Sequence, residues 1–284
     1  ERIVALKHPI CIEHIMNMSC GLPYGHTNDG TPTGREIFRV TEELKQREEG
    51  YTLREEIRAV SRVPVAFEPG ERWLYGFGSE LAAGLVEVVT GKPIHEALRD
   101  MIFAPLGMKD TGMIYFGDIR SRLATFYTLT ETGERMPGGA VMDEKSMPQA
   151  KPTGCPRLFS TVRDFAIFSQ ALSCGGKYKG TRLLEQGTID LMRTNRLNEQ
   201  QLKDFQNAYL AGYGYGLGVR TMIDQAKGGS NSSIGEFGWT GGSGTWVSMD
   251  PKERISVVYM HQLAPNMEKY HHLRVRACVY GALQ

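Results

Sequence analysis

Residues 237–261, FGWTGGSGTWVSMDPKERISVVYMH, carry the pattern that decides the fold. The stretch opens with a glycine-dense turn, where missing β-carbons let backbone N–H groups approach a bound ligand closely. Two β-prone runs follow, 245–249 and 254–261, and the polar residues 250–253 lie between them. We predict a β-hairpin beside a glycine-rich strand edge, which is a place where N–H groups can stabilise an oxyanion. An isolated glycine cluster is more often only a tight turn, so the interpretation depends on the rest of the chain.

Upstream of this hairpin the apolar residues recur mainly at helical spacing. We predict that Ser79 caps a helix over 80–90, whose apolar face is formed by Leu81, Leu85, Val88 and Val89. Helices in the middle of the chain with strands near its end predict an α+β fold, in which a helical lobe packs against an antiparallel sheet. We predict one domain over 1–284, with a mainly helical lobe at 14–200 and the C-terminal strands and closing helix at 210–284. The individual predicted elements are helices at 36–49, 53–60, 94–102, 161–174, 184–194 and 266–283 and a strand at 213–220.

The composition is that of an ordinary globular protein: 284 residues, 41% hydrophobic and 23% charged, with a net charge of +1. This balance does not favour a nucleic-acid partner, and no apolar run reaches the ~18 residues of a membrane span. The five cysteines are scattered, which predicts free, mostly buried thiols and a reducing, cytoplasmic compartment.

No metal or cofactor is expected, because the sequence has neither a ligand cluster at zinc spacing nor a phosphate-binding GK[ST] loop. The adjacent pair His271 and His272 is expected to lie on a solvated helix face.

Five further motifs occur in a fixed order along the chain and together resemble one family. The chain resembles the serine β-lactamase and penicillin-binding-protein superfamily, in particular its class C-like branch with the family VIII carboxylesterases and related acyltransferases. The motifs are HIMNMSCGL (14–22), PGERWLY (69–75), IFAPLGMKDT (102–111), LFSTVRD (158–164) and GWTGG (238–242).

This resemblance implies a serine nucleophile activated by a lysine one helical turn later, in the motif S-x-x-K. It implies that Tyr75 is the residue that shuttles protons, and that the strand motif Trp239-Thr240-Gly241 lines the substrate site. The backbone N–H of Gly242 is the implied donor to the oxyanion.

Two residues depart from the β-lactamase pattern and point towards an uncharged substrate. Trp239 stands where β-lactamases and peptidases have a cation that helps to hold the substrate carboxylate. Phe77 stands where β-lactamases usually have an asparagine that binds the acyl amide, and it cannot make that hydrogen bond. Both departures are typical of the esterase and acyltransferase members.

A third departure concerns the nucleophile, since no serine of this chain has a lysine three residues later. We expect the S-x-x-K motif and the first strands of the sheet to lie upstream of Glu1, so that the sequence is incomplete at its N-terminus. Ser19, Ser160 and Ser243 are poor substitutes, and loop hydrogen bonding or helix capping is expected for them.

The function predicted from the sequence is therefore a serine hydrolase that acts through an acyl-enzyme, most simply a carboxylesterase or acyltransferase on uncharged esters. The expected partner is a small-molecule ester, amide or lactam, and the oligomeric state stays open. One alternative is a β-lactamase or D-alanyl-D-alanine carboxypeptidase, which Trp239 and Phe77 disfavour. The other alternative is a non-catalytic binding module of the same fold, which the absence of S-x-x-K favours.

Overall fold

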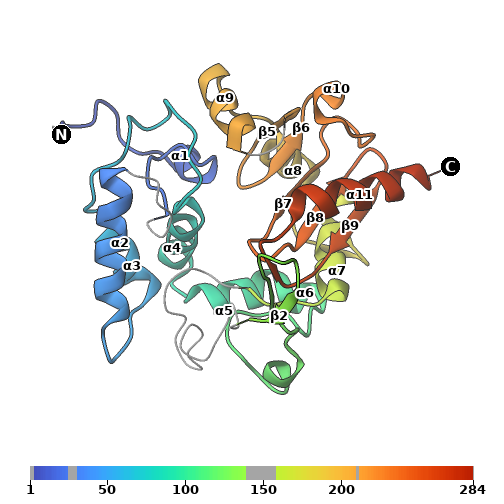
Figure 1. Cartoon of the computed structure of the whole chain (residues 1–284), viewed down its shortest axis with the longest axis horizontal. Helices are drawn as coiled ribbons and strands as arrows, with labels where there is room; N and C mark the ends of the chain where they lie inside the picture. Colours follow the sequence, from blue (N-terminus) through green and yellow to red (C-terminus); the bar gives the residue numbers. More distant parts are fainter. Residues whose placement is uncertain (1–2, 25–30, 139–157, 209–210, 284) are drawn as a thin grey trace.

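The computed structural model describes residues 3–24, 31–138, 158–208 and 211–283. In Figure 1 the helices α2, α3 and α4 gather on one side, and the main sheet with its covering helices lies on the other. The first and second halves of the chain thus form the two sides of the molecule.

The main sheet has five antiparallel strands in the order β5-β6-β7-β8-β9. The predicted hairpin is present, because β8 pairs with β9 through the turn at 251–254. The glycine-dense segment is a strand as far as Thr240, and its turn begins only at Gly241. The strands are β5 (Tyr213–Tyr215), β6 (Arg220–Met222), β7 (Phe237–Thr240), β8 (Trp246–Asp250) and β9 (Ile255–Tyr259).

Helices cover both faces of this sheet. Phe237 and Met249 are register partners, and they are buried against Leu172 of α7 (Val162–Ser173) and Ile189 of α8 (Gln186–Arg193). Side chains of alternate residues point to opposite faces of a strand. Trp246 therefore faces the other way, where it stacks on a histidine of α11 (Glu268–Gly281).

The helical lobe has its own core, in which Ile37, Val60 and Leu22 are buried together. Local sequence begins its helices: the Thr52 hydroxyl accepts from the Glu55 N–H at 3.3 Å, while the Glu55 carboxylate accepts from the Thr52 N–H at 2.8 Å. The helices of this lobe are α1 (Ile12–Met16), α2 (Pro32–Lys45), α3 (Leu53–Val60), α4 (Gly78–Thr90), α5 (Ile94–Leu98), the π-helix η1 (Arg99–Phe103) and α6 (Ala104–Leu106).

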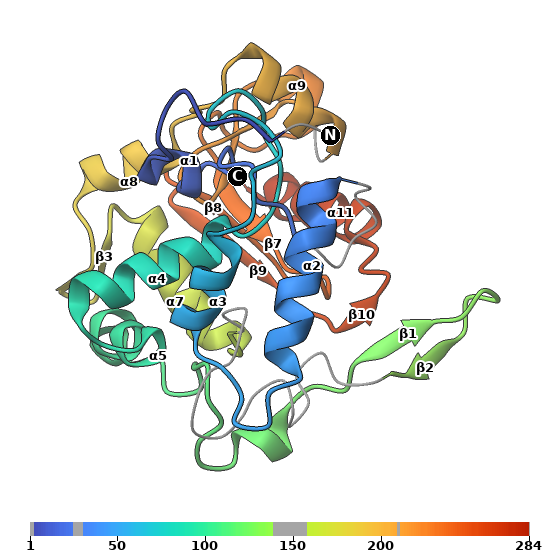
Figure 2. The same cartoon turned by 90° about the vertical axis from the view of Figure 1, so that its left-hand side faces the viewer.

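Smaller elements connect the two parts. Figure 2 shows that the hairpin of β1 (Tyr127–Leu129) and β2 (Arg135–Pro137) projects from the body of the molecule. The strand β10 (Leu263–Ala264) pairs with β1 in parallel. The remaining elements are the 3₁₀ helix η2 (Ile119–Arg122), β3 (Lys177–Tyr178), β4 (Thr181–Arg182), α9 (Glu199–Ala208) and α10 (Gln225–Gly228).

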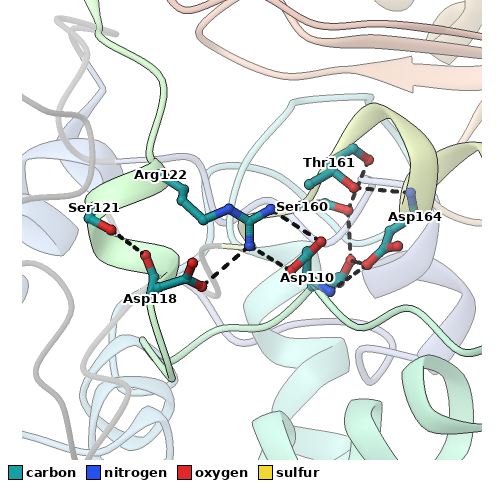
Figure 3. A network of polar contacts seen from close by, with 8 residues as sticks. Asp110, Asp118, Ser121, Arg122, Ser160, Thr161 and Asp164 are labelled. Carbon is teal, nitrogen blue, oxygen red and sulfur yellow. Dashed lines mark hydrogen bonds and ion pairs between the residues drawn. The ribbon is translucent and has the colours of Figure 1, made fainter.

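Two of the sequence motifs, 102–111 and 158–164, have a structural role, because the polar side chains of each make hydrogen bonds to the other (Figure 3). Asp164 accepts hydrogen bonds from the Asp110 N–H at 2.7 Å and from the Thr111 hydroxyl at 2.9 Å. Thr161 caps α7 by accepting from the Asp164 N–H at 3.1 Å, and Ser160 bonds the Thr111 hydroxyl at 2.8 Å. These contacts join the segments 102–111 and 158–164 into one support beneath the sheet.

Several sequence predictions were wrong in detail. The helix α4 begins at Gly78 after Phe77, so Ser79 lies inside it and does not cap it. Val88 and Val89 are 67% and 85% exposed, because the helix buries a face that includes Glu80 and Glu87 instead. The helix α9 was not predicted at all, since its sequence is almost entirely polar.

The cysteines were also only partly as expected. All four that lie within the described residues are free thiols, but only Cys20 is buried, while Cys11 and Cys278 are exposed. Cys155 lies outside the described residues. A search of the described parts of the chain for a helix long and apolar enough to cross a membrane finds none.

Candidate active site

Tyr75 is positioned by two loop segments, 18–24 and 70–77, that lie side by side. The Leu74 N–H donates to the Met18 carbonyl at 2.9 Å, and the Phe77 N–H donates to the Leu22 carbonyl at 2.9 Å. Between these contacts a β-carbon on Gly76 would lie 2.1 Å from the Leu22 oxygen, so only glycine fits there. The first two motifs therefore form one unit that holds the Tyr75 backbone.

Tyr75 meets the main sheet through Trp239 of β7. The indole Nε1 of Trp239 donates to the Tyr75 hydroxyl at 3.2 Å, and the two ring centroids are 5.4 Å apart. These residues are 164 positions apart in the sequence. The contact brings the implied proton-shuttling residue and the implied strand motif into a single site, as the resemblance requires.

The Tyr75–Trp239 pair lies within a cluster of aromatic side chains. The Trp239 ring is 5.1 Å from the Tyr215 ring, and the Tyr75 ring is 5.7 Å from the Tyr24 ring. Trp73 completes the cluster, 6.4 Å from Tyr75. An apolar surround of this kind lowers the local dielectric, which strengthens any hydrogen bond made to the Tyr75 oxygen.

Sequence reasoning did not identify Tyr24, Trp73 or Tyr215 as part of the site. Tyr24 follows the first motif by two residues, and Trp73 lies inside the second motif. Tyr215 belongs to the alternating run GYGYGLG at 212–218, which predicted only a strand. Proximity to Tyr75 and Trp239 in space, rather than any pattern of their own, distinguishes them.

Phe77, expected to form the wall of the acyl site, lies deeper than the other site residues. It is 5% exposed and packs in the core of the helical lobe with Cys20 and Val63. It touches the site through Tyr24, whose ring is 5.3 Å from the Phe77 ring. A substrate contact for Phe77 stays a prediction.

Gly242 lies in the tight turn between β7 and β8. The Gly244 N–H donates to the Gly241 carbonyl at 2.9 Å and closes the turn, which leaves Gly242 exposed at its first corner. Among the described residues, no acceptor takes the Gly242 N–H, and a β-carbon added there would meet nothing within 4 Å. The group is thus accessible to a ligand, as a donor to an oxyanion must be.

The same turn is braced from the opposite face of the sheet by α11. His272 is buried, stacks on Trp246 at 5.5 Å and makes a 3.1 Å hydrogen bond from Nε2 to the Gly244 carbonyl. Burial, reinforced by two nearby arginines, lowers the pKa of His272 to about 4. The expectation of a solvated histidine pair is therefore wrong for His272, which supports the turn as a neutral ring.

Two of the three serines that were considered as substitute nucleophiles, Ser19 and Ser160, have structural roles. Ser19 is fully buried and donates to the Asn17 side chain at 2.6 Å, and Ser160 belongs to the network of Figure 3. No group of three or more histidine, cysteine, aspartate or glutamate side chains within the described ranges could hold a metal ion.

Comparison with known proteins shows which family the chain belongs to. A sequence model of the family described as Beta-lactamase matches residues 4–279. Protein Rv1367c of Mycobacterium tuberculosis strain H37Rv is 27% identical over 272 residues, covering 94% of this chain and 66% of that protein. The chain thus spans slightly less than two thirds of this relative's length.

Two solved structures share the fold. EstCE1, described as a hydrolase with promiscuous acyltransferase activity, superposes with a TM-score of 0.80 at 22% identity over 97% of this chain and 73% of that one. Simvastatin Synthase (LovD) from Aspergillus terreus gives a TM-score of 0.80 at 21% identity, covering 100% of this chain and 71% of that one. At these identities they establish the fold alone, and they confirm the predicted class: helices packed on an antiparallel sheet.

Proposed function

Because the chain belongs to the β-lactamase family, whose members are hydrolases, we propose that the native protein is a serine carboxylesterase or acyltransferase acting on uncharged esters. The observation that carries this proposal is the hydrogen bond from the Trp239 indole to the Tyr75 hydroxyl. It places an uncharged side chain beside the proposed proton shuttle, at the position where β-lactamases have a cation that helps to hold an anionic substrate.

The proposed reaction has two steps. Tyr75 accepts the proton of a serine hydroxyl as its oxygen attacks the ester carbonyl, and the Gly242 N–H stabilises the oxyanion. Collapse of this intermediate breaks the ester C–O bond, and the alcohol leaves with the proton. Water or a second alcohol then attacks the acyl-serine, which gives an acid or a new ester and restores the serine.

We propose that the nucleophilic serine, with its lysine, belongs to a part of the native protein outside these 284 residues. No S-x-x-K occurs within them, while the chain spans 66% of its mycobacterial relative. EstCE1 is described as a hydrolase with promiscuous acyltransferase activity and LovD as a synthase, and we take these descriptions to favour ester chemistry over lactam hydrolysis.

The decisive experiment is fluorophosphonate labelling of the native protein, followed by peptide mapping of the adduct. The expected result is one label on a serine upstream of Glu1 that is followed three residues later by lysine. No label on the native protein would exclude the hydrolase and leave the non-catalytic module. Loss of labelling after incubation with penicillin would instead favour a β-lactamase or carboxypeptidase.

Substitution of Tyr75 tests its proposed role separately. In the native protein, Tyr75→Phe keeps the ring contacts but removes the oxygen that accepts the proton. We expect the turnover of a neutral p-nitrophenyl ester to fall at least ~100-fold, the usual contribution of a general base. A rate close to wild type would remove Tyr75 from the mechanism.

A further inference from the structure

A pair of buried arginines lies between the main sheet and α11. Arg220 of β6 and Arg276 of α11 are 3% and 1% exposed. Arginine stays protonated in proteins, so both positive charges are present inside the fold at any physiological pH.

Among the described residues, one buried carboxylate forms an ion pair with this arginine pair, and a second, partly exposed carboxylate, that of Glu268, lines the cavity described below. Glu236 is fully buried and sits 3.5 Å from the Arg220 guanidinium, while the Tyr213 hydroxyl donates to it at 2.9 Å. The other buried carboxylate of the region, Asp250, accepts from the Tyr280 hydroxyl at 2.7 Å and from backbone N–H groups instead. The Arg220–Arg276–Glu236 cluster therefore carries a net positive charge.

The donors of Arg276 are unused. Within the described part of the chain, none of its three side-chain nitrogens has a hydrogen-bond partner, and neither does Nε of Arg220. The Arg276 guanidinium touches only aromatic faces, 5.1 Å from the Trp246 ring and 5.5 Å from the Tyr213 ring. A buried cation with unmade hydrogen bonds is costly unless an anion completes it.

A small cavity adjoins both arginines. Its volume is about 30 Å³, and Arg220, Arg276, Trp246 and His272 are among the residues that line it. Trp239 and Thr240 of β7 form another wall, and Glu268 and Lys269 of α11 also line the cavity. Because about 10–15 Å³ of such cavity volume is enough for one water molecule, the cavity has room for one small ion.

We propose that this cavity is a halide site, in which one chloride ion accepts hydrogen bonds from Arg276 and Arg220 and balances the buried charge. The volume suits a monatomic anion better than a carboxylate-bearing molecule. Trp246 and Thr240 are register partners on the α11 face, and Trp239 also lines the cavity, so the ion lies between α11 and β7, next to the strand that carries the proposed substrate site. It would hold α11 against the strand that carries Trp239 and Gly242.

The test measures the folding equilibrium of the native protein by urea unfolding at constant ionic strength, with sodium bromide exchanged for sodium gluconate, whose anion is too large for the cavity. If bromide binds only the folded state, the folding equilibrium constant should rise about tenfold for each tenfold rise in bromide above its Kd. Crystals grown in bromide should show an anomalous peak between Arg220 and Arg276.

Two variants on one helix give the matched control. Arg276→Met should abolish the bromide dependence, whereas Arg274→Met, at an exposed position two residues earlier in α11, should keep it. If Arg276→Met does not fold, the anomalous peak of the unsubstituted protein decides alone. The proposal would be overturned if the free energy of unfolding did not change with bromide, if acetate stabilised the protein and bromide did not, or if no anomalous peak appeared between the two arginines.

Discussion

Trp239→Phe is the substitution that tests the site most directly. Phenylalanine keeps an aromatic ring against Tyr75, but it removes the indole N–H that donates to the Tyr75 oxygen at 3.2 Å. The hydrogen bond is part-buried, and it is stronger to the phenolate form of Tyr75, which can accept the serine proton, than to the neutral phenol.

The magnitude follows from that difference. A neutral hydrogen bond contributes ~1 kcal/mol net, and one to a charged group contributes ~1.5–3 kcal/mol. The loss specific to the charged phenolate is therefore roughly 0.5–2 kcal/mol, which corresponds to a fall of about 2- to 30-fold in kcat/KM for a neutral p-nitrophenyl ester. Since the phenolate is needed for proton transfer and not for holding the ester, most of the change should fall in kcat rather than KM.

A double-mutant cycle in the native protein separates this effect from altered packing. In the Tyr75→Phe background there is no oxygen for the indole to contact, so adding Trp239→Phe should cost little more. Losses that simply multiply in the double variant would refute the reasoning, and would show that Trp239 acts through packing or through the substrate.

Two further substitutions test the support of the site. Gly76→Ala places a β-carbon 2.1 Å from the Leu22 oxygen and should destabilise the fold by at least ~2 kcal/mol in urea unfolding, whereas Gly187→Ala in α8, where nothing lies within 4 Å, should be neutral or stabilising. An equal effect at both glycines would contradict this. Burial, followed by the charge of Glu80, raises the pKa of Glu56 to about 7 from 4.5, so the folded state keeps a proton that the unfolded state releases, and stability should decline as pH rises through this window. Glu56→Gln should remove that part of the decline and exceed wild type by up to roughly 3 kcal/mol at about pH 8, with no difference near pH 4; unfolding curves of the two proteins that run parallel at every pH would count against it.

Local sequence was enough to predict most of the elements, because their signals are short-range. The hairpin of β8 and β9 follows from two β-prone runs around a polar turn, and α7 follows from apolar spacing, although the helix begins at Val162 and Thr161 is its cap. Prediction failed where burial depends on distant partners. Val88 and Val89 continue an apolar pattern, yet no other element covers them, and α9 has little apolar pattern although Asp204 anchors it to Arg72 at 2.7 Å.

The sequence by itself determined the chemistry that the site can offer: a phenol at Tyr75, an indole in place of a cation at Trp239, and a glycine-dense turn at Gly242. Only the tertiary structure decided which of these groups meet. The contact of Tyr75 with Trp239 joins residues 164 positions apart, and the cavity lined by both Arg220 and Arg276 lies between a strand and the closing helix. Spacing along a chain carries no information about such contacts. They form where the helical lobe packs against the sheet, and each of these two parts is held together by burial of its own apolar residues.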